Sequence, residues 1–168
     1  MTKKLISILI PFYNEPNSLT KIIDEIKIVE NQIKKNYDIE ILLLDNHSND
    51  SSVKEANSLS KSNNNIKLIR HSRNFGYQSN ILSGYYNCSG EAAIQLDADG
   101  QDDPKVILDF IKYWEEGYQV VYGIRKKRKE FFINNIIRKT FYRFLSFISE
   151  INIPIDAGDF RLVDKKII

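Results

Sequence analysis

The chain has 168 residues, of which 42% are hydrophobic and 27% charged, and these are ordinary values for a single globular domain. A formal net charge of +2 indicates no particular class of partner, and one cysteine with two histidines excludes an internal disulfide and argues against a Cys/His zinc site. No apolar stretch approaches the roughly 20 residues of a membrane-spanning helix, and no secretory signal follows Lys3 and Lys4. We therefore expect a cytoplasmic, reducing location and no transmembrane segment in this chain.

Strand-like and helix-like stretches alternate as far as Tyr122. Short, β-branched apolar runs predict buried strands, and longer stretches with apolar residues at every third or fourth position predict helices. The predicted strands span 5–10, 39–44, 66–69, 92–96 and 120–122, and the predicted helices span about 19–33, 53–60, 76–86 and 104–116. This alternation favours parallel pairing with right-handed crossovers, and hence a three-layer, doubly wound α/β domain.

Individual residues predict where these elements end. Pro11 follows the first strand and is expected to end it. Either Asn17 or Ser18 can cap the first helix with its side chain. Asp103 and Pro104 together predict the start of the last helix, with the aspartate as cap and the proline at the first helical position.

Two carboxylates, Asp97 and Asp99, follow the predicted strand 92–96 with one residue between them. With the two-residue period of a strand they can point to the same side, at the edge where open α/β sheets bind ligands. Such close carboxylates repel each other unless a positive charge lies between them, and a divalent cation carrying a diphosphate meets that need. The competing interpretation is an acidic turn that caps a helix.

The pattern changes after the predicted strand 120–122. Five cations in a row occupy 125–129, and aromatic and aliphatic residues recur at helical spacing over 131–149, interleaved with arginine and lysine. This segment predicts an amphipathic helix, which either packs on the sheet or lies along an anionic membrane surface. Beyond it, the segment 156–162 places three charges around a glycine.

Four segments together resemble the family 2 glycosyltransferases of the GT-A fold. They are IPFYNE at 10–15, LDNHSND at 44–50, RHSRNFG at 70–76 and DADGQDD at 97–103. Three later segments are similar to the polyprenyl-phosphate glycosyltransferases within that family, namely WEEG at 114–117, GIRKKR at 123–128 and DAGDFRL at 156–162. The resemblance implies one GT-A (Rossmann-like) nucleotide-diphospho-sugar transferase domain over 1–168, with a mainly parallel sheet, that ends earlier than the catalytic domain of other members.

The resemblance also implies a donor site at the ends of the strands. A ring at Tyr13 would stack on a nucleobase beside Pro11, and Glu15 would accept from the base or ribose. The nucleoside-binding aspartate of the family corresponds to Asp45, but asparagine follows it here where the family commonly has a second aspartate, so either Asp45 or Asn46 makes the base contact. The other residues matched to the donor site are Arg73, Gly76, Asp97, Ala98, Asp99, Gln101 and Arg125.

The same resemblance assigns the metal and the chemistry. Asp97 and Asp99 would hold Mg²⁺ or Mn²⁺ against the donor diphosphate. The catalytic carboxylate would be Asp159, with Asp156 as the second choice, acting as a base or, toward an acceptor that is already anionic, as an orienting group. Arg161, Lys127 and Arg128 would meet the acceptor phosphate. For Asp159 and Arg161 the competing interpretation is a structural ion pair.

We therefore expect an inverting, metal-dependent glycosyltransferase that moves a sugar from a nucleotide-sugar to polyprenyl phosphate at the cytoplasmic face of the membrane. UDP is the expected nucleotide and GDP its rival; nucleic acid is not an expected partner, and the oligomeric state stays open. One alternative keeps the fold and transfers to a polysaccharide or another sugar. A nucleotidyltransferase is disfavoured because no glycine-rich basic signature follows the first strand. A nucleotide-binding fragment without activity is the non-catalytic alternative.

Overall fold

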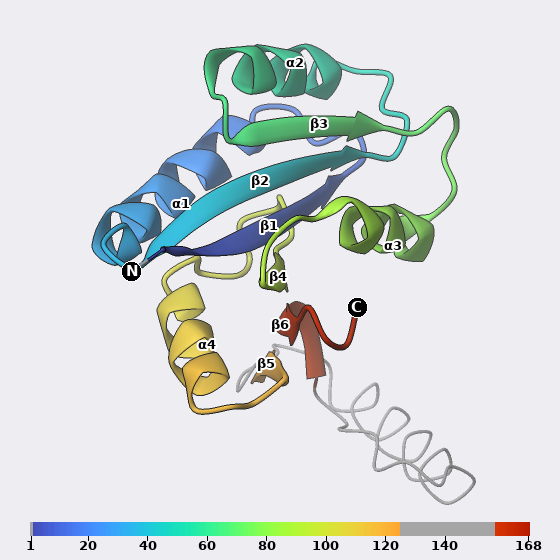
Figure 1. The fold of residues 1–168 in the computed structure, drawn as a ribbon. Coiled ribbons are helices and arrows are strands. Elements are labelled where there is room, and N and C mark those ends of the chain that lie inside the picture. Colours follow the sequence, from blue (N-terminus) through green and yellow to red (C-terminus); the bar gives the residue numbers. More distant parts are fainter. Residues whose placement is uncertain (1, 125–156) are drawn as a thin grey trace, which may run out of the picture.

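The computed structural model describes residues 2–124 and 157–168, and these residues form one six-stranded sheet with helices on both faces (Figure 1). The strands are β1 (Lys4–Phe12), β2 (Tyr37–Asp45), β3 (Ile66–Arg70), β4 (Ala92–Gln95), β5 (Val120–Ile124) and β6 (Ala157–Asp164). The helices are α1 (Leu19–Ile33), α2 (Ser52–Ser62), α3 (Tyr77–Asn87) and α4 (Val106–Glu115). The alternating α/β pattern predicted from the sequence is therefore confirmed.

The sheet has the order β3-β2-β1-β4-β6-β5 and is mixed rather than wholly parallel. The first four strands in this order are parallel neighbours, whereas β6 pairs antiparallel with both β4 and β5. The sequence prediction lacked β6 and was incomplete there, because β6 carries charged residues and a glycine and shows no continuous apolar run. Its insertion pairs Arg161 with Gln95 at the end of β4, the strand that leads into the acidic pair, and Asp159 lies two residues before Arg161 on β6.

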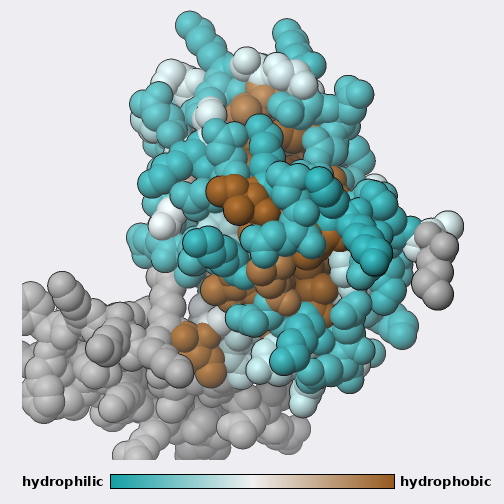
Figure 2. All heavy atoms as spheres, turned by 90° about the vertical axis from the view of Figure 1, so that its left-hand side faces the viewer, coloured by the Kyte–Doolittle hydropathy of each residue, from teal (hydrophilic) through white to brown (hydrophobic). Residues whose placement is uncertain are grey.

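Two apolar cores hold the layers together. The larger core packs α1 and α4 on one face of the sheet and includes side chains from α2, and the smaller core packs α3 on the opposite face through Ile81. In Figure 1 these helices accordingly lie on the two sides of the sheet. The side facing the viewer in Figure 2, which is the left-hand side of Figure 1, is mostly hydrophilic with hydrophobic atoms showing in its middle. None of the described helices is long and apolar enough to cross a bilayer.

Three predicted element ends were wrong in detail. β1 continues through Pro11 to Phe12, so the proline does not end the strand. Ser18 precedes α1, but its hydroxyl donates to the carbonyl of Glu15 and does not cap the helix. α4 begins at Val106, because the preceding residues form a turn in which the Asp103 carboxylate accepts from the amide of Lys105.

A buried carboxylate, Glu40, fastens β2 to its neighbours. It accepts from the Ser7 hydroxyl at 2.6 Å, the Lys67 ammonium at 2.9 Å and the Ser89 amide. Burial alone would raise the pKa of Glu40, but the hydrogen bonds from Ser7, Lys67 and Ser89 outweigh it and lower that pKa below 4.5. The ionised carboxylate therefore stabilises the fold above pH 4.5, and this contribution is lost as the pH falls through the lowered value.

We expect Glu40→Gln to lower the free energy of unfolding at pH 7 by about 1–3 kcal/mol, because an amide cannot replace all these charge-assisted bonds. The deficit should shrink in urea titrations carried out below pH 4. Glu116→Gln, on an exposed side chain, is the matched control and should leave stability unchanged at both pH values. A deficit that is the same at both pH values would contradict the role of the Glu40 charge.

Candidate active site

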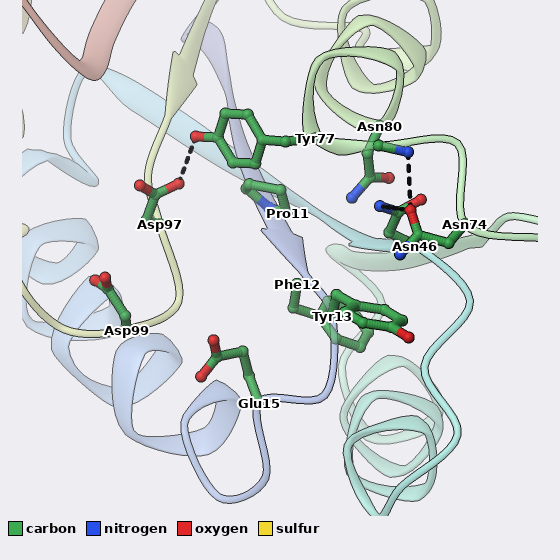
Figure 3. Close-up of a pocket in the computed structure, with 11 residues that line it drawn as sticks. Pro11, Phe12, Tyr13, Glu15, Asn46, Asn74, Tyr77, Asn80, Asp97 and Asp99 are labelled. Atoms are coloured by element: carbon green, nitrogen blue, oxygen red, sulfur yellow. Dashed lines mark hydrogen bonds between the residues drawn. The ribbon is translucent and has the colours of Figure 1, made fainter.

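A cavity of about 410 Å³ opens where β1, β2 and β4 end and α3 begins (Figure 3). This is the edge of a parallel sheet where the carboxyl ends of the strands meet. The volume is in the range of ligand-binding clefts. The residues that line it are Pro11, Phe12, Tyr13, Glu15, Asn46, Asn74, Gly76, Tyr77, Asn80, Asp97 and Asp99.

One side of the cavity is acidic. Asp97, Asp99 and Glu15 lie on this side in Figure 3, and Asp97 is half-buried whereas Asp99 is exposed. Burial is the largest cause that raises the pKa of Asp97, and the negative charges of Asp99, Asp159 and Asp102 raise it further. A hydrogen bond from the Tyr77 hydroxyl opposes these effects. The site thus concentrates negative charge.

The two carboxylates fit a divalent cation that is shared with a ligand. In residues 2–124 and 157–168, no lysine or arginine forms a salt bridge with Asp97 or Asp99. Within the same ranges, no three His, Cys, Asp or Glu side chains are grouped so that they alone could hold a metal. Mg²⁺ at nucleotide sites typically takes one or two carboxylates and completes its shell with phosphate and water oxygens. A carboxylate pair at a ligand-sized cavity matches that donor set.

The other side of the cavity is built from neutral amides. Asn46 donates through Nδ2 to Oδ1 of Asn74 at 2.9 Å and accepts at Oδ1 from the amide of Phe75 at 3.0 Å. Asn80, at the first turn of α3, is buried and donates to the carbonyl of Leu44 at 2.8 Å. These bonds join the end of β2 to the segment before α3 and to the first turn of α3. They form a polar, uncharged wall opposite the acidic side.

Asp45 and Asn46, the two residues predicted for the base contact, have different positions in the structure. Asp45 is fully buried; its Oδ2 lies 3.0 Å from Nε of Arg70, and its Oδ1 accepts from the amide of Ser48 at 2.7 Å. Asp45 does not line the cavity, whereas Asn46 does. The aspartate therefore shapes the turn that presents the asparagine.

The loop after β1 contributes Tyr13 and Glu15 to the lining of the cavity. The ring of Tyr13 is 44% exposed, so a ligand can reach its face. Asn14 holds this loop against the one after β2, because its amide donates to Oγ of Ser48 and its Oδ1 accepts from the amide of Asn49, both at 3.0 Å. Asn14 adopts a φ of 55°, in the left-handed region that asparagine tolerates better than most residues.

The remaining predicted donor residues lie in different places. Gly76 lines the cavity with a φ of 85°, which favours glycine, and no neighbouring atom lies within 4 Å of where a Cβ would stand. Arg73 is not a lining residue and lies over the ring of Phe75, with 4.7 Å from Cζ to the ring centroid. Ala98 is buried in the larger core. The amide of Gln101 donates to Oδ1 of Asp99 at 2.9 Å and so supports that carboxylate.

β6 places one of the two predicted catalytic carboxylates near the acidic pair. Asp159 is exposed, and its charge is close enough to raise the pKa values of Asp97 and Tyr77. Arg161 donates to Oε1 of Gln95 at 3.2 Å, and among the described residues it forms no ion pair with Asp159. The predicted site residues Asp156, Arg125, Lys127 and Arg128, and the predicted amphipathic segment 131–149, lie outside the described residues.

Four lining residues were not among the predicted site residues. Phe12 and Asn74 lie within the family-like segments 10–15 and 70–76, and Tyr77 and Asn80 were predicted only as part of a helix. The sequence does contain a pattern that indicates Tyr77 and Asn80 as site residues, because they lie three residues apart just after Gly76. On the first turn of a helix that spacing places two side chains on the same face, here beside a glycine that allows a ligand to approach.

Comparison with known proteins identifies the family. The model of a family described as glycosyl transferase family 2 matches residues 7–168. The chain belongs to glycosyltransferase family 2. The family that the sequence motifs resemble is thereby confirmed.

Relatives of this family 2 chain extend the comparison. The glycosyltransferase YkcC of Bacillus subtilis (strain 168) is 43% identical over 162 residues, which cover 96% of this chain and 50% of YkcC. The bactoprenol glucosyl transferase of Shigella phage SfV is 30% identical over 166 residues, which cover 97% of this chain and 53% of that protein. The chain thus spans about half the length of the curated relatives it matches.

A solved structure supports the fold. Glucosyl-3-phosphoglycerate synthase from Mycobacterium tuberculosis, in complex with Mn²⁺, uridine diphosphate and phosphoglyceric acid, superposes with a TM-score of 0.68 over 97% of this chain and 56% of that one, at 16% sequence identity. This likeness confirms the GT-A fold with its mostly parallel sheet. At this identity it establishes the architecture alone.

Proposed function

We propose that this family 2 chain transfers a sugar from a nucleotide-sugar, with UDP as the expected nucleotide, to polyprenyl phosphate at the cytoplasmic face of a membrane, with inversion. The observation that carries the donor half of the proposal is the two-sided cavity. Asp97 and Asp99 form its acidic side, and Asn46 and Asn74 belong to its amide side. A nucleoside diphosphate has matching parts, namely a diphosphate that carries a cation and a base with donors and acceptors.

Each side of the cavity then has a chemical task. Tyr13 offers an exposed ring on which the base can stack, and Asn46 offers an amide that can both donate and accept. Asp97 and Asp99 would hold Mg²⁺ or Mn²⁺, which when bound neutralises the charge that grows on the departing nucleoside diphosphate. Glu15 lies beside the pair and would accept a hydrogen bond from the base or from a ribose hydroxyl. The Mn²⁺ and UDP in the solved structure of similar fold are compatible with this choice of ligands.

The acceptor part of the proposal is supported by the residues of β6 and by the relatives of this chain. In the proposed step an acceptor phosphate oxygen attacks the anomeric carbon, the bond from that carbon to the diphosphate breaks, and the nucleoside diphosphate leaves with the electron pair. Asp159, exposed near Asp97, would orient the acceptor or accept a proton from it. Arg161, with Lys127 and Arg128 in the basic segment, would bind the acceptor phosphate. Support for polyprenyl phosphate comes from the bactoprenol glucosyl transferase among the relatives.

The first experiment is calorimetric titration of UDP and then GDP into the folded chain, with Mn²⁺, with Mg²⁺ and with a chelator. We expect UDP to bind only when a divalent cation is present and GDP to bind more weakly. Preference for GDP would change the nucleotide but keep the site. No binding of either nucleotide to folded protein would overturn the donor assignment.

A second measurement separates transfer from binding alone. Labelled donor is incubated with the chain, with and without polyprenyl phosphate, and the labelled lipid and the free sugar are quantified. We expect lipid-dependent transfer; free sugar formed from the donor at an equal rate without lipid would favour a different acceptor. Nucleotide binding without any turnover would favour a binding fragment.

A further inference from the structure

Three hydrogen bonds connect Arg161 of β6 to Asp97 of the acidic pair through Gln95 and Tyr77, to which the proposed mechanism gives no role. Nη2 of Arg161 donates to Oε1 of Gln95 at 3.2 Å. Nε2 of Gln95 donates to the hydroxyl of Tyr77 at 2.7 Å, and that hydroxyl donates to Oδ1 of Asp97 at 2.7 Å. The last of these bonds is drawn in Figure 3. The chain of bonds runs from β6 through β4 and the start of α3 to the candidate metal ligand.

The chemistry of the first residue fixes the direction of every bond. A guanidinium has donors and no acceptor, so the side-chain oxygen of Gln95 must face Arg161. The amide nitrogen of Gln95 therefore faces Tyr77, and an amide nitrogen can only donate. The Tyr77 oxygen accepts this bond, which leaves its single proton for Asp97. The bond from Tyr77 to Asp97 cannot reverse while Arg161 and Gln95 are in place.

The backbone holds this hydroxyl at a defined position. Gln95 is 1% exposed on β4, so its amide has little freedom. Tyr77 is the first residue of α3, directly after Gly76 with its φ of 85°. Asn80 anchors the same helical turn to the carbonyl of Leu44 at the end of β2. The tyrosine hydroxyl is thus fixed relative to β2 and β4.

We propose that Tyr77 is a positioning residue for the metal ligand Asp97, holding one carboxylate oxygen so that the other is left for the cation, with Gln95 and Arg161 fixing the direction of the bond. The proposal rests on the metal site of the proposed function. It also gives Arg161 a role inside the protein in addition to any contact with an acceptor. Groups that orient a metal ligand from the outer shell typically change metal affinity by about 10- to 100-fold when removed.

The test is Mn²⁺ binding to the chain in the presence of UDP, followed by calorimetry and by the electron paramagnetic resonance spectrum of the bound ion. We expect Tyr77→Phe to weaken Mn²⁺ binding about tenfold and to alter the spectrum, because Asp97 is no longer held in one orientation. The melting temperature of the metal-free protein reports separately on the fold. Tyr86→Phe is the matched control, on the same helix with a side chain that is 75% exposed, and should behave as the wild type.

A second variant tests the direction of the chain of bonds. Gln95→Met keeps the size of the side chain and removes its amide, so we expect a smaller loss of Mn²⁺ affinity than in Tyr77→Phe. Because Gln95 acts through Tyr77, the double variant should bind Mn²⁺ no more weakly than Tyr77→Phe alone. If the losses of Mn²⁺ affinity in the two single variants add up in the double variant, Gln95 does not act through Tyr77. Unchanged Mn²⁺ affinity in folded Tyr77→Phe would overturn the positioning role of Tyr77. Failure of the wild type to bind Mn²⁺ with UDP would instead refute the metal site itself.

Discussion

Asp97→Asn is expected to weaken binding of the metal–nucleotide complex by more than the roughly 100-fold that marks the upper range for an outer-shell partner. The variant removes a direct ligand charge, and a neutral amide is a poor substitute for a carboxylate toward Mg²⁺ or Mn²⁺. The amide oxygen still accepts the bond from Tyr77, so the local packing is retained. Calorimetric titration of Mn²⁺ and UDP into the variant measures the loss, and Asp99→Asn should show a comparable one.

The same variant should raise the melting temperature of the metal-free protein. The pKa of Asp97 is raised above 3.8 in the folded chain, first by burial and then by its acidic neighbours. Because the folded chain favours the protonated carboxyl, Asp97 contributes to folding stability below pH 3.8, and this contribution is lost as the pH rises through the raised pKa. At pH 7 the carboxylate is ionised and lowers the free energy of unfolding. Asparagine is neutral at every pH and avoids this cost.

The control for both effects is Asp38→Asn, which removes the same charge at the opposite end of β2. Asp38 is exposed and pairs with Lys3 at 2.9 Å, and exposed pairs of this kind contribute little. We expect nucleotide binding and melting temperature to stay at the wild-type values in this variant. If Asp97→Asn bound UDP with the wild-type affinity and the same dependence on Mn²⁺, the cation would be held by residues other than Asp97.

The sequence was sufficient for those parts of the fold that local patterns encode. Ile8, Leu43 and Ile94 lie in short, β-branched apolar runs that predict buried strands, and the intervening stretches have helical spacing. The order of strand and helix then dictates parallel neighbours. Asp97 and Asp99 could be placed at the ligand edge for the same reason, because whatever follows a buried parallel strand emerges there.

Features that depend on distant partners could not be predicted. β6 pairs with β4 and β5 across long stretches of chain, and its own residues give no strand signal. The pair of buried Asp45 with exposed Arg70 likewise joins two strands, and it holds Asp45 away from the cavity that Asn46 lines. Tyr77 acquires its role from Gln95, which belongs to another element. Side chains of adjacent strands and helices meet only after the sheet has formed.

Asp159→Asn is expected to lower sugar transfer to polyprenyl phosphate by about 100-fold while leaving Mn²⁺-dependent UDP affinity within a few-fold of the wild type. This loss lies at the lower end of the range for acid–base catalysis, since a lipid phosphate is already ionised and needs orientation more than deprotonation. Labelled-sugar transfer and calorimetry on the same preparation separate the two quantities. Asp109→Asn, an exposed aspartate on α4, is the control and should transfer at the wild-type rate.

Comparing the rate of sugar transfer with the metal-dependent UDP affinity in Asp159→Asn shows which role the Asp159 carboxylate has. Asp159 lies near enough to raise the pKa of Asp97, so it is a candidate for either the metal site or the acceptor site. If Asp159→Asn loses metal-dependent UDP affinity as strongly as Asp97→Asn, the residue belongs with the metal ligands. If only transfer falls, β6 faces the acceptor, and its position between β4 and β5 sets the acceptor directly against the donor cavity.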